Sequence, residues 1–141
     1  MRTLDETPDM NQDVIAQIAF DRDGLVPVIA QQAGTGEVLM LAWMNRAAVA
    51  ETIDSGRLCY YSRSRQELWR KGETSGQSQR LVELRIDCDG DSLLAIVDQT
   101  GVACHTGRRR CFYRVLAGAQ AGAVEPVMVE PEVLYGHTSR P

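Results

Sequence analysis

Residues 81–97 of the chain read LVELRIDCDGDSLLAIV. Apolar and charged side chains alternate over residues 81–86, and this period of two predicts a half-buried β-strand. The apolar members of that strand are Val82, Leu84 and Ile86. Residues 92–97 form a second apolar run that predicts another short strand. Between the two runs lie three aspartates and a cysteine, a mixture that core packing does not require.

Further strands are predicted on the N-terminal side of this stretch. Residues 25–30 read as a strand, in which Pro27 indicates an edge position or the beginning of the strand. A glycine-bearing loop over residues 32–36 leads to a returning strand over 37–43, so the two strands are expected to form a β-hairpin. Residues 58–62 are rich in β-favouring side chains and predict one more strand.

One helix is clearly signalled. Asn45 occupies an N-cap position, residues 46–55 have apolar side chains at helical spacing, and Gly56 supplies the stop. Residues 14–20 fit either a short helix or a strand. We therefore expect a mainly antiparallel β or α+β fold, in a single compact domain with about one clear helix.

The ends of the chain differ in composition from its middle. Residues 1–23 read as a polar leader, loose over its first thirteen residues. Residues 24–116 hold the predicted domain, with 110–116 as its last core strand. Residues 117–141 contain three prolines and three glycines. They are predicted to be a C-terminal extension that wraps the same domain or is partly disordered.

The overall composition is that of a soluble globular protein, with 44% hydrophobic and 24% charged residues among 141. No apolar run reaches the length of a membrane span, and the polar N-terminus lacks the apolar core of a signal peptide. We therefore expect a cytoplasmic protein with no membrane partner. Thiols stay reduced there, which favours metal binding or catalysis over disulfides.

Charge is unevenly distributed. The net charge is −4, but residues 57–114 carry eleven Lys/Arg against seven Asp/Glu. The overall acidity argues against a nucleic-acid partner. The basic middle could hold an anionic small molecule, or it could be a solvated surface.

Three cysteines with unusual spacing suggest a metal site. Cys88, Cys104 and Cys111 contain no Cys-x-x-Cys pair, which excludes a zinc ribbon or finger. Three protein ligands plus a water are typical of catalytic zinc, although small apolar cysteines are the alternative. Cys59 lies in an apolar run and is predicted to be a core residue. His105 could be a further ligand, or it could manage the proton of a water, which we prefer because adjacent side chains on an extended chain point apart.

The aspartates suggest a second site. If the strand continued beyond residue 86, then Asp87, Asp89 and Asp91 would share one face, and Cys88 would point to the other. The carboxylates suit a hard cation such as Mg²⁺, or they form a solvated acidic turn. An EF-hand is excluded because Ser92 occupies the position that needs glycine. Since a strand edge can receive another subunit, a zinc site shared between subunits is a hypothesis.

A polar segment over residues 63–76 combines cations, hydroxyls, glycines and a tryptophan. Such a loop can bind an anion through its backbone N–H groups and cationic side chains, while Trp69 could stack on a base. An ordinary solvated loop is the alternative.

Several groups of residues, in order along the chain, carry a resemblance to a known family. They are 24–31 (GLVPVIAQ), 38–45 (VLMLAWMN), 61–65 (YSRSR), 68–69 (LW) with 71–76 (KGETSG), 87–91 (DCDGD), and 103–107 (ACHTG) with 111–112 (CF). As an ordered set they resemble the phosphoribosyl-AMP cyclohydrolases of histidine biosynthesis. Many members of that family have His where this chain has Arg70.

The resemblance implies a hydrolase that opens the adenine ring of 1-(5-phosphoribosyl)-AMP between N1 and C6. It implies an intertwined homodimer that depends on Zn²⁺, one per subunit, and on Mg²⁺. The implied zinc ligands, drawn from both subunits, are Cys88, Cys104 and Cys111, and the implied magnesium ligands are Asp87, Asp89 and Asp91. A zinc-activated hydroxide would attack C6, with His105 handling the proton. Candidate substrate-binding residues are Arg63, Arg65, Trp69, Lys71, Glu73, Thr74 and Ser75.

Two competing functions fit the sequence less well. A zinc nucleobase deaminase would also attack adenine C6, but it needs a His-x-Glu and Pro-Cys-x-x-Cys pattern that this sequence lacks. A zinc module that binds nucleic acid would have four closed ligands and a basic net charge, and neither is present.

Overall fold

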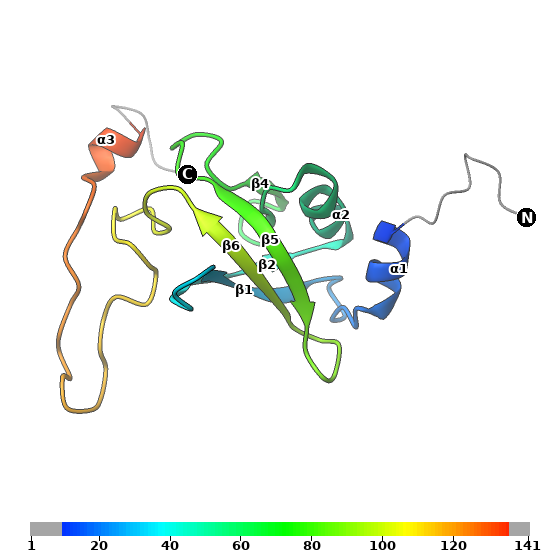
Figure 1. The fold of residues 1–141 in the computed structure, drawn as a ribbon, viewed down its shortest axis with the longest axis horizontal. Helices are drawn as coiled ribbons and strands as arrows, with labels where there is room; N and C mark the ends of the chain where they lie inside the picture. The colour runs from blue at the N-terminus through cyan, green and yellow to red at the C-terminus, as the bar shows by residue number, and fades with distance from the viewer. Residues whose placement is uncertain (1–9, 136–141) are drawn as a thin grey trace, which may run out of the picture.

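The structure, a computed structural model, describes residues 10–135, which form six strands and three short helices (Figure 1). The strands are β1 (Val26–Gln32), β2 (Val38–Met44), β3 (Cys59–Ser62), β4 (Glu67–Arg70), β5 (Gln79–Ile86) and β6 (Leu93–Gln99). The helices are α1 (Met10–Gln17), α2 (Arg46–Ser55) and α3 (Pro131–Tyr135). The predicted α+β class is confirmed. Within residues 10–135, no helix is long and apolar enough to cross a membrane.

The central sheet has the strand order β2-β1-β6-β5. β1 pairs antiparallel with β2, which confirms the predicted hairpin, and β5 pairs antiparallel with β6 across the turn at residues 87–92. The two hairpins join through a parallel pairing of β1 with β6, which begins at Val28. β1 is therefore an inner strand, and Pro27 lies just before its parallel pairing starts. Of the two positions predicted for Pro27, the strand's beginning is correct and the edge is wrong.

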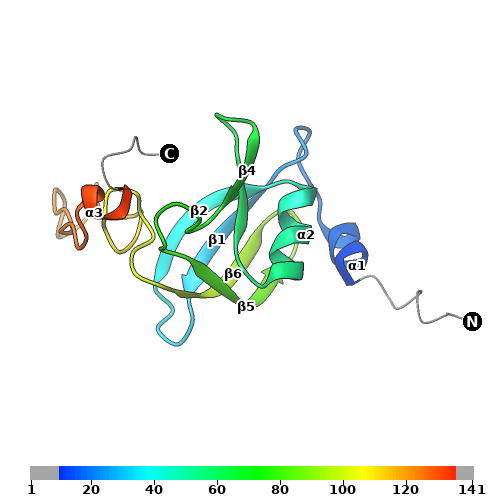
Figure 2. The same ribbon diagram turned by 90° about the horizontal axis from the view of Figure 1, so that it is seen from above.

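The core lies on one face of this sheet. α2 and the β3–β4 hairpin cover that face (Figures 1 and 2), and the side chains beneath them are fully buried. Among these are Val28, Ala30, Ala95 and Val97. The opposite face carries the half-exposed apolar residues Ile29, Leu94 and Ile96, together with Leu41, which is 46% exposed. No helix or strand of the described chain packs over this apolar face.

The predicted helix α2 is confirmed together with both of its caps. The Asn45 side chain accepts a hydrogen bond from the Ala48 N–H at 2.9 Å. Gly56 adopts a left-handed φ of +73°, a conformation that other residues rarely adopt, and its N–H bonds to the Thr52 carbonyl. The buried Thr52 hydroxyl bonds to both backbone groups of Cys59, at 3.0 and 3.2 Å. The end of the helix is thereby fastened to β3.

Two segments are more ordered than predicted. The polar segment 63–76 contains β4, which pairs with β3 so that Trp69 lies opposite Tyr60. Their rings are 5.4 Å apart, and this contact with the core overrides the polar composition of the segment. α1 begins at Met10, inside the stretch predicted to be loose, and it settles the open choice for residues 14–17 in favour of a helix. Residues 1–9 of the predicted leader lie outside the described part of the chain.

The strand predicted over 81–86 is present, but its inward-facing set differs. The register shifts between Leu81 and Glu83, so the two-residue period is broken there. Leu81 and Leu84 consequently pack against the core, whereas Val82 is 51% exposed and Ile86 is 39% exposed. The prediction that Val82 is buried is wrong because a bulge cannot be read from the alternation of residues.

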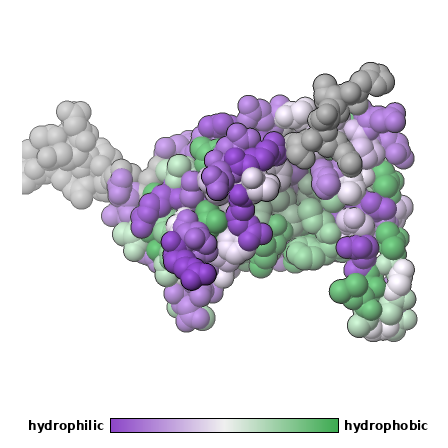
Figure 3. Space-filling model, turned by 180° about the vertical axis from the view of Figure 1, so that it is seen from behind, coloured by the Kyte–Doolittle hydropathy of each residue, from purple (hydrophilic) through white to green (hydrophobic). Residues whose placement is uncertain are grey.

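The prediction of a last core strand over residues 110–116 is wrong. Apart from one isolated bridge between Arg114 and Val124, this segment is irregular, and Leu116 is 91% exposed. The chain instead makes a long excursion to about residue 128 and ends in the short helix α3, at the left of Figure 1. Exposed apolar side chains colour this excursion in Figure 3. Residues 136–141 lie outside the described part of the chain.

Candidate active site

The loop after β6 brings together two of the three cysteines predicted to bind metal. Cys104 is buried, and its Sγ lies 3.0 Å from the Thr106 hydroxyl. The Cys111 N–H donates to the Leu39 carbonyl of β2 at 2.7 Å, which fixes the loop to the edge of the sheet. The Cys104 and Cys111 thiols lie close enough together for Cys104 to affect the pKa of Cys111.

The environment of this thiol pair favours a cation. Burial, followed by the charge and hydrogen bond of Cys104, raises the pKa of Cys111 to about 12. Cys111 as a residue is exposed, but the raised pKa means that its thiol is harder to deprotonate unless a positive charge is supplied. Paired thiols are preferred ligands of soft and borderline metal ions, so this pair fits zinc.

Lys71 lies beside the same pair. It is only 9% exposed, and its Nζ donates to the carbonyl of Ala103, next to Cys104, at 2.6 Å. Burial lowers the pKa of Lys71, and the nearby Cys111 and Cys104 groups oppose that shift. The ammonium group of Lys71 therefore contacts the backbone of the loop after β6 that carries Cys104 and Cys111, which we call the thiol loop.

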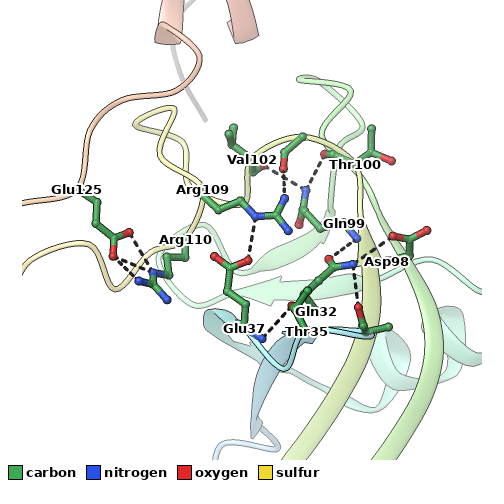
Figure 4. Close-up of polar contacts among 12 residues, drawn as sticks. Gln32, Thr35, Glu37, Asp98, Gln99, Thr100, Val102, Arg109, Arg110 and Glu125 are labelled. Carbon is green, nitrogen blue, oxygen red and sulfur yellow. Dashed lines mark hydrogen bonds and ion pairs between the residues drawn. The ribbon is translucent and has the colours of Figure 1, made fainter.

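A buried polar network that the sequence did not reveal holds the first part of this loop. The Tyr60 hydroxyl donates to Gln79 Oε1 at 2.6 Å, and Gln79 Nε2 donates to Gln99 Oε1 at 2.8 Å. Gln99 Nε2 in turn donates to the carbonyls of Thr100 and Val102, as Figure 4 shows. The backbone that leads from β6 to Cys104 is therefore held in place by amide side chains.

A cavity of about 720 Å³ opens beside the thiol loop. It is lined by Leu41, Ala42, Trp43, Tyr61, Ser62, Arg63, Ser64, Arg65, Trp69, Lys71, His105, Cys111 and Tyr135. His105 and Cys111 thus share one cavity with four of the predicted substrate-binding residues. Trp43, which the sequence did not single out, carries the Arg63 guanidinium 4.5 Å above its ring. The cavity combines aromatic walls with positive charge.

A smaller cavity of about 250 Å³ adjoins the first and shares Arg65, Trp69, Lys71 and Tyr135 with it. Glu73, Thr74 and Ser75 line this smaller cavity. All seven side chains predicted to contact substrate therefore line one or both cavities. Arg70 also borders the smaller cavity, but its guanidinium is held by Glu51 through hydrogen bonds of 2.6 and 2.7 Å.

The three aspartates cluster in the turn between β5 and β6. One carboxylate oxygen of each of Asp87, Asp89 and Asp91 lies within 4.8 Å of the others, and all three residues are exposed. The hydrogen bond and charge of Asp87 raise the pKa of Asp91. The prediction assumed a continuing strand, which is wrong because residues 87–92 form a turn. The carboxylates nevertheless converge, and their arrangement fits a hard divalent cation.

Cys88 belongs to that turn and is exposed, at the opposite end of β6 from the loop that carries the other two thiols (Figure 1). The turn precedes β6 and the thiol loop follows it, so the seven residues of this strand separate them (Figure 1). At about 3.3 Å per residue the strand alone spans roughly 20 Å. Among the described residues, the aspartates are the only group of three potential ligands whose ligand atoms lie this close together. One copy of the chain does not unite its three predicted zinc ligands.

The chain is a small α+β protein in which aromatic and cationic side chains line two adjoining cavities. Residues 40–113 match the family model for phosphoribosyl-AMP cyclohydrolase. Phosphoribosyl-AMP cyclohydrolases of Halorhodospira halophila and Rhodospirillum centenum are 63% and 62% identical to the chain over 123 residues. These alignments cover 87% of the chain and 87% and 92% of the relatives. The same enzyme of Granulibacter bethesdensis is 63% identical over 126 residues, 88% of the chain and 98% of the relative. The chain belongs to the phosphoribosyl-AMP cyclohydrolase family.

Proposed function

We propose that this chain hydrolyses 1-(5-phosphoribosyl)-AMP in histidine biosynthesis, opening the adenine ring between N1 and C6. The observation that carries the proposal is the larger cavity, in which a thiol, an imidazole, cationic side chains and two tryptophans share one space. These groups match a substrate that has an aromatic ring between two phosphorylated sugars. The close relatives with this name support the same reaction.

The thiol pair would supply two zinc ligands from one subunit, and Cys88 of the partner subunit would supply the third. Zinc bound by three thiolates, with an open position, lowers the pKa of a water towards ~7 and so provides a nucleophile at neutral pH. The separation of Cys88 from Cys104 and Cys111 in one copy supports a site shared between two copies. We therefore propose one Zn²⁺ per subunit in a homodimer.

The chain's own residues would then orient the substrate and move protons. Ribosylation at N1 leaves the ring cationic, which makes C6 electrophilic. His105 lines the cavity beside Cys111 and would accept the proton of the attacking water and return it to N1 as the ring opens. Arg63 and Arg65 would bind phosphate, and the 73–75 segment would bind phosphate or ribose in the smaller cavity.

The aspartate turn would hold Mg²⁺ and, through it, a phosphate of the substrate. Its three carboxylates are the ligand type that magnesium prefers, and their clustering needs a cation or hydrogen-bond donors to offset repulsion. In a shared site, this turn would approach the cavity of the partner subunit together with Cys88. The apolar sheet face, with Ile29, Leu41, Leu94 and Ile96, and the exposed edge strand β5 offer surface for such a dimer. We place this enzyme in the cytoplasm.

The deciding experiment is a spectrophotometric assay with phosphoribosyl-AMP in Zn²⁺ and Mg²⁺. We expect turnover that a chelator abolishes and that Zn²⁺ restores, without release of ammonia. Ammonia release would indicate deamination at C6 instead of ring opening. The absence of turnover when Zn²⁺ and Mg²⁺ are both present would overturn the proposal. Metal analysis of Cys104→Ser, with Cys59→Ser as a matched control, should show loss of zinc only in the first variant.

A further inference from the structure

The C-terminal segment, residues 122–135, folds back onto the loop that carries the thiol pair. The Gly107 carbonyl accepts hydrogen bonds from the N–H groups of both Met128 and Val129, at 2.8 and 3.0 Å. Gly107 has a φ of +84°, and any Cβ there would overlap the Val129 carbonyl oxygen. Two residues after His105, the loop and the returning segment are therefore in direct backbone contact.

Glu125 makes a second connection between the same two parts of the chain. The Arg110 guanidinium donates to both carboxylate oxygens, at 3.0 Å from its Nε, as Figure 4 shows. The Arg108 guanidinium donates to the Glu125 carbonyl at 2.8 Å, and the Glu125 N–H bonds to the Tyr113 carbonyl. Each bond is partly exposed and weak on its own, but together they fix the path of the segment.

These two connections lead the chain into α3, which ends beside the proposed substrate site. Leu134 is 6% exposed and anchors the helix. The next residue, Tyr135, lines both the larger and the smaller cavity. Tyr135 therefore stands where the two cavities meet, between the side of His105 and Cys111 and the side of Thr74 and Ser75.

We propose that Tyr135 contacts the substrate, packing against the ribose that links the reacting ring to a phosphate. This inference rests on the proposed function. The reacting ring belongs beside His105 and Cys111 in the larger cavity, while Arg65, Thr74 and Ser75 give the smaller cavity donors for a phosphate. The sugar between them then passes the junction at which Tyr135 stands. An aromatic side chain there supplies contact area at little cost in side-chain entropy.

The test is steady-state kinetics of Tyr135→Ala and Tyr135→Phe with phosphoribosyl-AMP, in the full chain with both metals. We expect KM to rise roughly 3- to 10-fold in Tyr135→Ala, with kcat nearly unchanged, because the contact is made equally in the ground and transition states. Tyr135→Phe should stay close to the wild type if the ring makes the contact. If Tyr135→Phe is as impaired as Tyr135→Ala, the hydroxyl and not the ring makes the contact, which would contradict the packing proposed here.

Val133→Ala is the matched control, since Val133 lies on the same helix and is 76% exposed. It should leave KM unchanged. A folded Tyr135→Ala protein with the KM of the wild type would overturn the inference. The proposed function fails in a different way, through the absence of turnover in the wild type, so the two failures are distinguishable.

Discussion

At the scale of single residues, the buried polar side chains are the feature of the structure that is hardest to predict from the sequence. Tyr60 and Gln79 are fully buried and hydrogen-bonded to each other, and neither belongs to a motif. A polar residue on an inward-facing strand position looks like a surface residue in any periodicity argument. By contrast, Cys59 was predicted to lie in the core from its apolar surroundings, and its 1% exposure confirms that.

Tyr60→Phe removes one hydroxyl from this network while it keeps the ring that packs on Trp69. Oε1 of the Gln79 side chain then loses its donor inside the core, so we expect the free energy of unfolding to fall by about 1–3 kcal/mol. Urea unfolding measures this change. Tyr61→Phe, at the neighbouring half-buried position, is the control and should change stability by less than about 0.5 kcal/mol. Equal stability of both variants would contradict the role given to the network.

Cys59 predicts a pH effect on stability. Burial, followed by the hydrogen bond of Glu51, raises the pKa of Cys59 to about 12. The unfolded chain therefore loses this proton first, and stability contributed by the protonated thiol falls as the pH rises above about 9. Cys59→Ala should make the decline between pH 9 and about 12 shallower in urea unfolding experiments. Parallel curves for wild type and variant would show that the pKa of Cys59 is the same in the folded and unfolded states, against this prediction.

At the scale of secondary-structure elements, local signals succeeded where they were self-contained. The helix α2 was predicted from its caps, and the β1–β2 hairpin from its glycine-bearing loop. β4 was missed because its pairing with β3 and its contact with Tyr60 are tertiary. The strand predicted over 110–116 failed because apolar residues such as Leu116 lie on the excursion, where no core covers them.

The N-cap of α2 gives an element-scale prediction. Asn45→Ala removes the acceptor for the Ala48 N–H and should lower the free energy of unfolding by about 1 kcal/mol. Asn45→Asp keeps an acceptor at the same place and is the matched control. Thermal or urea unfolding of the three proteins decides the matter. A loss of equal size in Asn45→Asp would assign the effect to something other than the cap.

At the scale of the whole molecule, the candidate site was predicted residue by residue but not as a geometry. The six-residue interval between Cys104 and Cys111 suits one loop, and the structure places their thiols together. The distance between Cys88 and this pair could not be predicted. It depends on the length of β6, and on the turn with Cys88 and the loop with the pair lying at opposite ends of that strand. Tyr135 carried no signal at all, because only the fold of the C-terminal segment brings it to the cavity.

The proposed sharing of zinc between subunits predicts complementation. Cys88→Ala and Cys104→Ala should each be inactive, because each dimer lacks a ligand in both sites. After unfolding and refolding as an equal mixture, half of the dimers combine one chain of each kind, and each such dimer has one intact site. We therefore expect about one quarter of the wild-type activity.

Cys104→Ala mixed with Cys111→Ala is the matched control for this experiment. Both substitutions fall in the same loop, so every site in every dimer retains a defect and no activity should return. Recovery in this control mixture would show that Cys104 and Cys111 act from different subunits, against the thiol pair proposed here. Absence of recovery in the first mixture after verified refolding would exclude a site that combines Cys88 of one subunit with Cys104 of the other.

The larger cavity has one more consequence, which concerns how binding can be observed. The chain contains two tryptophans, Trp43 and Trp69, and both line that cavity. Each has a cationic side chain near its ring, Arg63 at 4.5 Å and Lys71 at 5.5 Å. A ligand that enters must disturb these surroundings, so the intrinsic fluorescence of the protein reports on occupancy without any attached dye. Trp43→Phe and Trp69→Phe would assign the signal to one wall or the other.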